Sequence, residues 1–234
     1  MHPILFQIGN LKIYSYGVMV ALGFLSAVYL TGCEAKRRGI SSEKIFDIYL
    51  YVMIFGIIGA RLLHVILDIG YYAGRPLDVI MINRGGLAFQ GGLVFGILAA
   101  IVAIKKSGLP ILNTADMMIP YVALAQSIGR IGCFLNGCCY GVSDLHPTQI
   151  YLSIFFLAMF IALKKIYENA KTSGIVFTWY LLLFSFGSFF LDFLRGDLAV
   201  VYFNLRVSQF ISAVIFLLGL FMLAGLRWKT IHSR

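Results

Sequence analysis

The chain has 234 residues, of which 60% are hydrophobic and only 12% are charged, and its formal net charge is +9. Soluble domains are about half apolar and about a quarter charged, so this composition excludes an ordinary globular enzyme. Disorder and a disulfide-stapled secreted module are excluded too, because the chain is strongly apolar and has only four cysteines. With so few charges overall, the basic excess predicts a membrane with anionic lipids as partner, and no nucleic acid.

Apolar runs long enough to cross a bilayer predict an all-α membrane protein with about seven transmembrane helices. The runs are unbroken and do not alternate in polarity, which argues against a transmembrane barrel. The first run lacks a clear cleavage site and is interpreted as a retained span. We expect residues 1–234 to form a single polytopic membrane domain. In chain order the runs cover residues 14–32, 46–67, 86–104, 111–128, 148–163, 174–194 and 207–226.

The basic residues of the loops predict the orientation. Loops on the side of the C-terminus contain 12 Lys and Arg residues, those on the other side contain 6, and Arg61 within the second run completes the 19. Because basic loops stay in the cytoplasm, the N-terminus is predicted outside and the C-terminus in the cytoplasm.

Polar residues gather at the predicted outer ends of the runs, where burial in a bilayer makes them costly and therefore informative. Each has a structural alternative: Arg61 can donate to helix-end carbonyls, Asp192 and Arg195 can form an ion pair, and Gly92 with Gly96 is typical of close helix packing. The tyrosines can be interfacial belt residues. The residues in question are Tyr14, Tyr16, Arg61, His64, Arg84, Gln90, Asp192 and Arg195.

The glycine-rich segment 129–141, with the sequence GRIGCFLNGCCYG, is the densest polar feature. Four glycines in thirteen residues are unusual inside a span and predict a loop at membrane depth that approaches a ligand closely. The guanidinium of Arg130 fits a phosphate bidentately, and backbone N–H groups of the loop can donate beside it. The segment therefore predicts a site for an anionic lipid head group.

Three of the four cysteines, Cys133, Cys138 and Cys139, lie in this segment, whereas Cys33 is interpreted as an apolar filler. An outer disulfide, a nucleophilic thiol activated by Arg130 and inert buried thiols all remain open. The C-x4-C-C spacing is not a standard zinc pattern even with His146 as a fourth ligand, so no metal is expected.

The motif Gly-Arg-Ile-Gly-x-Phe-x-Asn-Gly at residues 129–137, followed by Tyr-Gly at 140–141, is the most specific pattern in the chain. It resembles the signature of the prolipoprotein diacylglyceryl transferase family, and the resemblance covers nearly the whole chain. Seven spans with an outside N-terminus also match that family. Supporting matches are Tyr16-Gly17, Gly59-Ala60-Arg61, Gly85-Gly86, Gln90-Gly91-Gly92, Asp116 with Pro120, and residues 146–151, His-Pro-Thr-Gln-Ile-Tyr.

The resemblance implies a multi-pass transferase of the bacterial cytoplasmic (inner) membrane. Such enzymes move the diacylglyceryl group of phosphatidylglycerol to the lipobox cysteine of a preprolipoprotein and form a thioether, with no metal or other cofactor. The implied partners are phosphatidylglycerol or a related anionic phospholipid, the preprolipoprotein signal peptide and the bilayer. Candidate catalytic residues are Arg130, Gln90 and Tyr16; candidate head-group ligands are Arg130, Asn136, Arg61, Gly132, Gly137 and Gly141.

Several positions depart from the family pattern. The family usually has His at Gln90, Asn at Cys133 and an acid at Cys138, and its sixth helix carries Tyr and Arg where this chain has Phe184 and Ser188. These changes remove a candidate base and a second phosphate cation, and a charge-assisted contact contributes roughly 1.5–3 kcal/mol.

Two alternatives to the transferase therefore stay open. One is a divergent paralogue with another acceptor, in which Cys133, Cys138 or Cys139 acts as the nucleophile. The other is a non-enzymatic lipid-binding protein or a transporter, which the nearly apolar inner halves of the spans disfavour.

Overall fold

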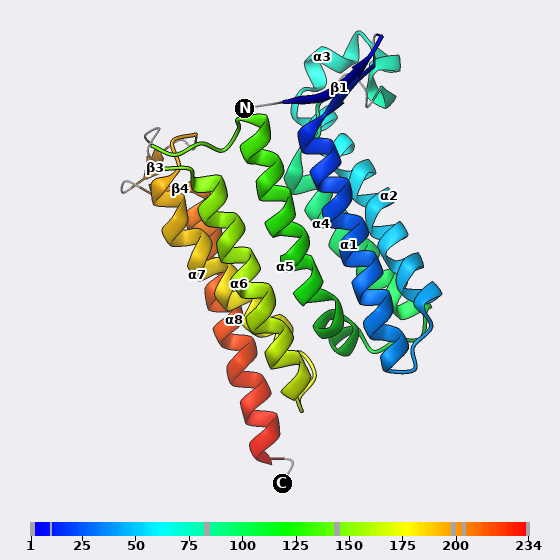
Figure 1. Ribbon diagram of the computed structural model, residues 1–234, viewed down its shortest axis with the longest axis vertical. Helices are drawn as coiled ribbons and strands as arrows, with labels where there is room; N and C mark the ends of the chain where they lie inside the picture. The colour runs from blue at the N-terminus through cyan, green and yellow to red at the C-terminus, as the bar shows by residue number, and fades with distance from the viewer. Residues whose placement is uncertain are drawn as a thin grey trace. The chain divides into compact units, whose positions relative to one another are not determined.

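In the part of the chain that the structure describes, seven helices are long and apolar enough to cross a membrane, and they account for most of the fold (Figure 1). The computed structural model describes residues 3–9, 11–81, 85–142, 146–197, 200–202 and 205–232. Within these ranges the all-α, multi-pass fold class predicted from the sequence is confirmed. The seven helices are α1 (Ser15–Arg37), α2 (Ser42–Leu67), α4 (Phe89–Lys106), α5 (Ile111–Asn136), α6 (Thr148–Asn169), α7 (Ile175–Leu191) and α8 (Val207–His232).

The largest departure from the predicted spans concerns α5. The sequence predicted a span over 111–128 followed by a glycine-rich loop, but the helix continues to Asn136 and includes Gly129 and Gly132. Glycine weakens a helix by roughly 0.5–1 kcal/mol, yet it is common where membrane helices approach closely. Gly132 lies at such an approach, because a β-carbon there would be 2.9 Å from the β-carbon of Met19 in α1.

The chain forms two compact units, one of residues 1–31 with 115–234 and the other of residues 32–114. In the second unit, α2 packs directly against α4. A β-carbon on Gly91 would collide with the carbonyl oxygen of Gly59, and one on Gly92 would lie 3.2 Å from that of Gly56. The close helix packing predicted from the GxxxG pattern is therefore confirmed.

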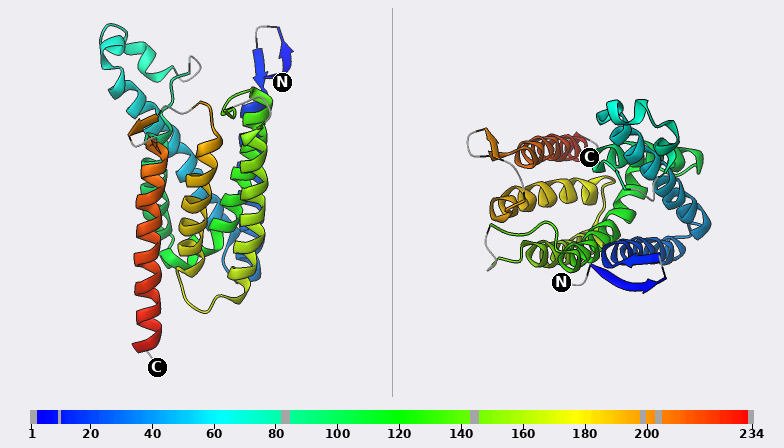
Figure 2. Two further views of the ribbon diagram at one scale, coloured as in Figure 1. Left: turned by 90° about the vertical axis from the view of Figure 1, so that its left-hand side faces the viewer. Right: turned by 90° about the horizontal axis from the view of Figure 1, so that it is seen from above.

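Helices α5, α6, α7 and α8 build the core of the first unit, in which α7 and α8 run side by side (Figure 2). Ser127 of α5 and Ser153 of α6 each donate to the other's carbonyl oxygen, at 2.8 and 2.9 Å. The carboxylate of Asp116 in α5 accepts from the backbone N–H groups of Gly174 and Phe177 and so caps the start of α7. These polar contacts fix how the helices of this unit meet.

Short elements at the helix ends were not predicted. Strands β1 (Ile4–Ile8) and β2 (Leu11–Tyr14) form an antiparallel hairpin before α1, and β3 (Val200–Tyr202) pairs with β4 (Leu205–Arg206) before α8. Helices α3 (Ile69–Ala73) and η1 (Pro76–Ile80) follow α2, and η3 (Asp192–Leu194) ends the α7 segment. The first hairpin precedes the first apolar run, and the second lies between the sixth and seventh runs.

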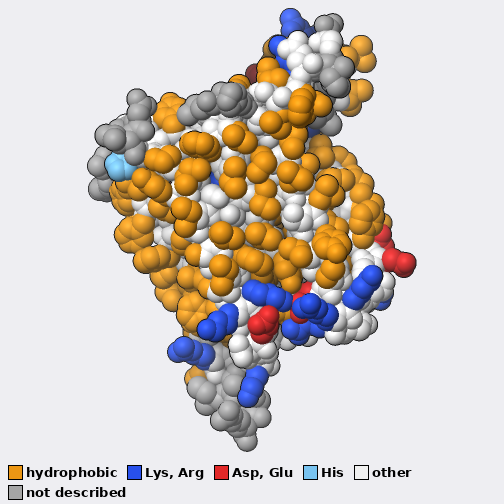
Figure 3. Space-filling view, in the orientation of Figure 1, with side chains coloured by type: hydrophobic (Ala, Val, Ile, Leu, Met, Phe, Trp, Pro, Cys, Tyr) orange, Lys and Arg blue, Asp and Glu red, His pale blue; other side chains and the backbone are white. Residues whose placement is uncertain are grey.

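Exposed side chains of the long helices are largely apolar, whereas Lys and Arg gather at helix ends (Figure 3). In the second unit, basic residues occupy the last turns of α1 and α4. This distribution fits helices that contact lipid along their length. The orientation with the N-terminus outside remains a prediction.

Candidate active site

The end of α5 turns sharply at Gly137, whose backbone has a φ of 76°. The N–H of Gly137 donates to the carbonyl of Phe134, and the N–H of Cys138 donates to that of Cys133, both at 3.2 Å. This pair of bonds is a Schellman motif, which needs a left-handed residue and so favours glycine. Gly137 therefore ends the helix and turns Cys138 and Cys139 back beside Cys133.

The loop that follows is held by the first turn of α6. Gln149 donates from its side-chain amide to the carbonyl of Cys138 at 2.8 Å, and the hydroxyl of Thr148 donates to that of Cys139 at 2.9 Å. Both α6 side chains are buried. Cys139 has a φ of 59°, a left-handed conformation that is unusual for a residue other than glycine. These two bonds help to hold that conformation.

The far end of the loop is tied to the segment after α7. The N–H of Val142 donates to Leu194, and the N–H of Gly196 donates to Tyr140, both at 2.9 Å. A β-carbon on Gly141 would overlap the carbonyl of His146, so this glycine serves close packing of the backbone.

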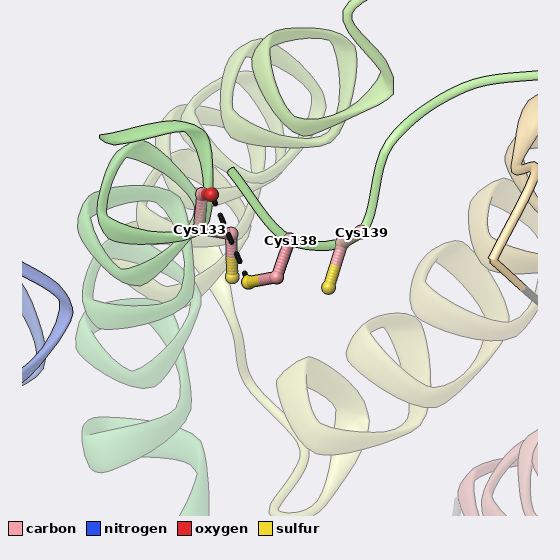
Figure 4. Close-up of side chains that lie close together, drawn as sticks. All are labelled: Cys133, Cys138 and Cys139. Carbon is pink, nitrogen blue, oxygen red and sulfur yellow. Dashed lines mark hydrogen bonds between the residues drawn. The ribbon is translucent and has the colours of Figure 1, made fainter. Parts of the chain in front are cut away.

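Three thiols converge at this turn, as Figure 4 shows. The sulfur atoms of Cys133, Cys138 and Cys139 all lie within 4.8 Å of one another, and all three cysteines are free thiols. A hydrogen bond with Cys133 and the charges of Arg195 and Arg130 lower the pKa of the Cys139 thiol, although burial opposes this. The turn therefore favours a thiolate at Cys139.

Arg130, in the last turns of α5, is half-buried, and its guanidinium carbon lies 5.9 Å from the centre of the Phe156 ring. Phe184 stacks on Phe156, and Tyr180 stacks on Phe184 in turn. Among the described residues the guanidinium has no hydrogen bond or ion pair. Its five N–H donors are therefore available to an anion.

Tyr16 lies in the first turn of α1, close to Gly132 of α5. A β-carbon on Gly132 would lie 3.4 Å from the α-carbon of Tyr16, which places the two helices in close contact. The Tyr16 side chain is 45% exposed, and its hydroxyl has no partner in the part of the chain that the structure describes. Asn136, the last residue of α5, is exposed at the same end of the helix.

Arg195, next to the loop, forms the ion pair with Asp192 that the sequence predicted, with 3.6 Å between the charged atoms. The sequence analysis missed its stronger partner, Asp197, which accepts two hydrogen bonds from the guanidinium at 3.0 and 2.7 Å. Burial of Asp197 opposes its ionisation, but the bonds and charge of Arg195 outweigh it and lower the pKa of Asp197. The spacing in Arg195-Gly196-Asp197 was a signal for this pair.

Arg61 in the second unit is buried and uses all of its nitrogens. It donates to the carbonyls of Val79 at 2.8 Å and Gly86 at 2.8 Å, and three further bonds reach Asp78, Met81 and Gly85. The structural alternative, in which Arg61 binds backbone carbonyls, is the one that the structure displays. Its guanidinium is therefore engaged by the protein's own backbone.

His64 and Gly86 pack beside Arg61. A β-carbon on Gly86, which has a φ of 78°, would collide with the His64 ring and lie 2.8 Å from an Arg61 nitrogen. Gln90 lies four residues on, exposed in the first turn of α4, and Arg84 is outside the described residues. In the second unit, Gln90 therefore follows a backbone segment, Gly85–Gly86, whose carbonyls accept hydrogen bonds from Arg61.

The predicted site residues therefore fall into two sets. The first unit brings together Arg130, Tyr16, the end of α5 and the three thiols, and the second contains Arg61 and Gln90. Sequence analysis did not foresee that Thr148 and Gln149 fix the thiol loop or that Phe156 lies under Arg130. Both sets belong to a multi-pass membrane protein, in which the guanidinium of Arg130, without a partner among the described residues, suits an anionic ligand.

Comparison with known proteins identifies the family. Residues 3–225 match the family model for prolipoprotein diacylglyceryl transferase, and the chain belongs to this family. Proteins named phosphatidylglycerol–prolipoprotein diacylglyceryl transferase include one from Clostridium tetani, 37% identical across 95% of this chain and 96% of its own length. One from Bacillus licheniformis is 31% identical across 98% of this chain and 94% of its own. The family resemblance noted in the sequence is confirmed, and the family is one of transferases.

Proposed function

We propose that this protein transfers the diacylglyceryl group of phosphatidylglycerol to the lipobox cysteine thiol of a preprolipoprotein. The observation that carries the proposal is the guanidinium of Arg130 near the end of α5, which has no hydrogen bond or ion pair within the described ranges. The curated relatives, named for this reaction, support it over nearly the whole chain.

Arg130 binds the phosphate of the lipid in this account. A planar guanidinium can donate two parallel hydrogen bonds to phosphate oxygens, and the Phe156 ring beneath it orients the fork. Tyr16 and Asn136 lie at the same end of the first unit and supply hydroxyl and amide groups to orient the glycerol. Gly132 contributes by allowing α1 to approach α5 closely.

The chemical step is a displacement at the carbon of the diacylated glycerol that is bonded to the phosphate oxygen. The acceptor sulfur forms a C–S bond as the C–O bond breaks, and the electron pair leaves with glycerol phosphate. Arg130 stabilises the negative charge on that leaving group. The thiol proton goes to the released phosphate, whose second pKa lies near 6, or to water.

The side-chain amide of Gln90 can donate a hydrogen bond but cannot act as a base, because a neutral amide does not take up a proton at ordinary pH. Arg61 has a structural role in this account, since it binds the carbonyls of Gly85 and Gly86 shortly before Gln90. The same proposal places the protein in the bacterial cytoplasmic membrane, with the reaction at the outer face. The lipid acyl chains and the signal peptide then contact the exposed apolar side chains of the helices.

The test is an assay of purified protein with labelled phosphatidylglycerol and a lipobox peptide. The wild type is expected to yield a thioether-linked diacylglyceryl peptide. Arg130→Ala is expected to lower the rate about 100-fold, because two charge-assisted bonds worth roughly 3 kcal/mol together are lost. Arg37→Ala is the matched control, since the Arg37 side chain is 77% exposed, and it is expected to keep full activity. Undiminished product with Arg130→Ala would overturn the proposal.

The convergence of three thiols near Arg130 favours a second candidate, in which a loop cysteine is the acceptor or nucleophile. A thioether on Cys139 would be stable, so this reaction would leave a diacylglyceryl adduct on the protein. Mass spectrometry of the reacted chain distinguishes the two: a modified peptide supports the first candidate, and a modified chain without peptide product supports the second. Tight lipid binding with neither product would indicate a lipid-binding protein.

A further inference from the structure

The transfer to a lipobox cysteine makes no use of the three converging thiols. Cys133 comes from the last turn of α5, while Cys138 and Cys139 come from the loop beyond it, and their side chains point to the same side of the turn (Figure 4). From this arrangement we propose that Cys133, Cys138 and Cys139 bind a soft, thiophilic d¹⁰ metal cation, of the class that includes Zn²⁺, Cd²⁺ and Cu⁺.

The spacing of the sulfur atoms suits one such ion. A zinc–thiolate bond is about 2.3 Å long, so two thiolates on one tetrahedral ion lie roughly 3.8 Å apart. All three sulfur atoms already lie within 4.8 Å of one another. Small rotations of the side chains can close the remaining gap, with no movement of the backbone.

The backbone that carries the ligands is fixed on both sides. The Schellman motif at Gly137 sets the position of Cys138 relative to Cys133. Thr148 and Gln149 bind the carbonyls of Cys139 and Cys138 from α6. A ligand set held by its surroundings loses less conformational entropy when it binds.

Charge balance also fits a cation at this place. Each thiol releases one proton to the buffer on binding, and three thiolates around a divalent ion leave a net charge of −1. Arg195 and Arg130 lie close enough to act on the Cys139 thiol and offset part of that charge. The C-x4-C-C spacing resembles no zinc finger because the ligands here come from one helix end and its turn.

Among the described residues, no fourth protein ligand joins the cluster. The sequence suggested His146, but its ring nitrogen lies 3.5 Å from the hydroxyl of Tyr151, and the converging ligand atoms in the described part of the chain are the three sulfurs. Three protein ligands leave a position for water or favour trigonal coordination. Trigonal coordination suits Cu⁺, and a tetrahedral site completed by water suits Zn²⁺.

The test uses the full-length protein in detergent, reduced and freed of metal, titrated with Cd²⁺ as a spectroscopic probe. A thiolate-to-cadmium absorbance band in the ultraviolet should rise and saturate at one ion per chain. Zn²⁺ and Cu⁺ are then added in competition, and the ion that displaces cadmium at the lower concentration is the preferred one.

Peptide mapping after alkylation locates the site without any variant. Bound cadmium should protect Cys133, Cys138 and Cys139 from alkylation and leave Cys33 unprotected. Cys138→Ser should weaken binding at least about tenfold, and Cys33→Ser should leave it unchanged. The proposal would be overturned if no saturable cadmium band appeared while all four cysteines reacted as free thiols. Cadmium binding by Cys138→Ser as tight as that of the wild type would overturn it too.

Discussion

Arg61 and Arg130 are both arginines of spanning helices with opposite surroundings. Arg61 in α2 is buried and gives its hydrogen bonds to five backbone carbonyls between residues 78 and 86. Arg130 in α5 rests over an aromatic ring and has no hydrogen-bonding partner among the described residues. The first therefore stabilises the fold of its unit, and the second is free for a ligand.

The difference teaches that the partners of a buried charge, and not its residue type, separate structural from functional arginines. A satisfied guanidinium has no donors to offer, whereas an unsatisfied one in an apolar setting has a strong preference for an anion.

Arg61→Ala should lower the free energy of unfolding by about 3 kcal/mol, because it leaves several buried carbonyls without donors. Thermal unfolding in detergent measures the change. Arg75→Ala, in the same unit, removes one exposed bond to Tyr71 and is the control, with an expected loss of about 0.5 kcal/mol or less. Equal free energies of unfolding for the two variants would contradict the claim that the hydrogen bonds of Arg61 stabilise the fold.

The glycines of α5 give a matched pair beside Arg130. Gly132→Ala should destabilise the protein by about 1–2 kcal/mol, because its β-carbon meets Met19 at 2.9 Å. A β-carbon at Gly129 would have no neighbouring atom within 4 Å, so Gly129→Ala should stabilise the helix by about 0.5–1 kcal/mol. Unfolding midpoints measure both variants. The same sign for both would contradict the close approach of α1 and α5.

Alkylation of Cys139 reports the electrostatics around Arg130. A lowered pKa means that the thiolate persists to lower pH, so in reduced, metal-free protein Cys139 should react faster near neutral pH than an ordinary thiol does. Cys133→Ala removes the hydrogen bond and should move the pH–rate curve to higher pH; Arg130→Gln should do so to a smaller extent. Mass spectrometry measures the alkylation rate of Cys139 between about pH 5 and pH 9, the range in which thiols titrate. An unchanged curve in both variants would exclude these causes.

The smallest effect is expected from Gln90→His. Gln90 is exposed in the first turn of α4, so the new side chain meets no steric obstacle in its unit. Transfer activity in the lipid and peptide assay should stay unchanged or rise, because imidazole can donate and can also accept a proton. Complete loss of activity would show that this protein uses a rebuilt site.

The seven spans could be predicted because bilayer thickness demands long apolar runs, and those runs are explicit in the sequence. The extension of α5 to Asn136 could not be read from composition. Gly129 and Gly132 lower helix propensity, and Gly132 is compensated by packing against α1, which depends on tertiary contacts. The hairpin before α1 was missed for a similar reason, since its short strands carry little signal.

The site was predictable in its residue types and less so in its contacts. The motif around Arg130 indicated an anion site, and the two outer charges of the sixth run indicated an ion pair, which the structure contains. That Asp197 takes two bonds from Arg195, or that Thr148 holds Cys139, depends on how a loop folds back. Such contacts have no periodic signature in the sequence.

The most direct test of the central claim measures transfer rate and unfolding midpoint together for Arg130→Gln and Arg61→Gln. The account predicts that Arg130→Gln keeps the wild-type midpoint but loses transfer to the lipobox peptide. Arg61→Gln should lower the midpoint and retain transfer in proportion to the folded fraction. A stable Arg130→Gln protein with wild-type transfer would contradict the claim that Arg130 binds the lipid phosphate.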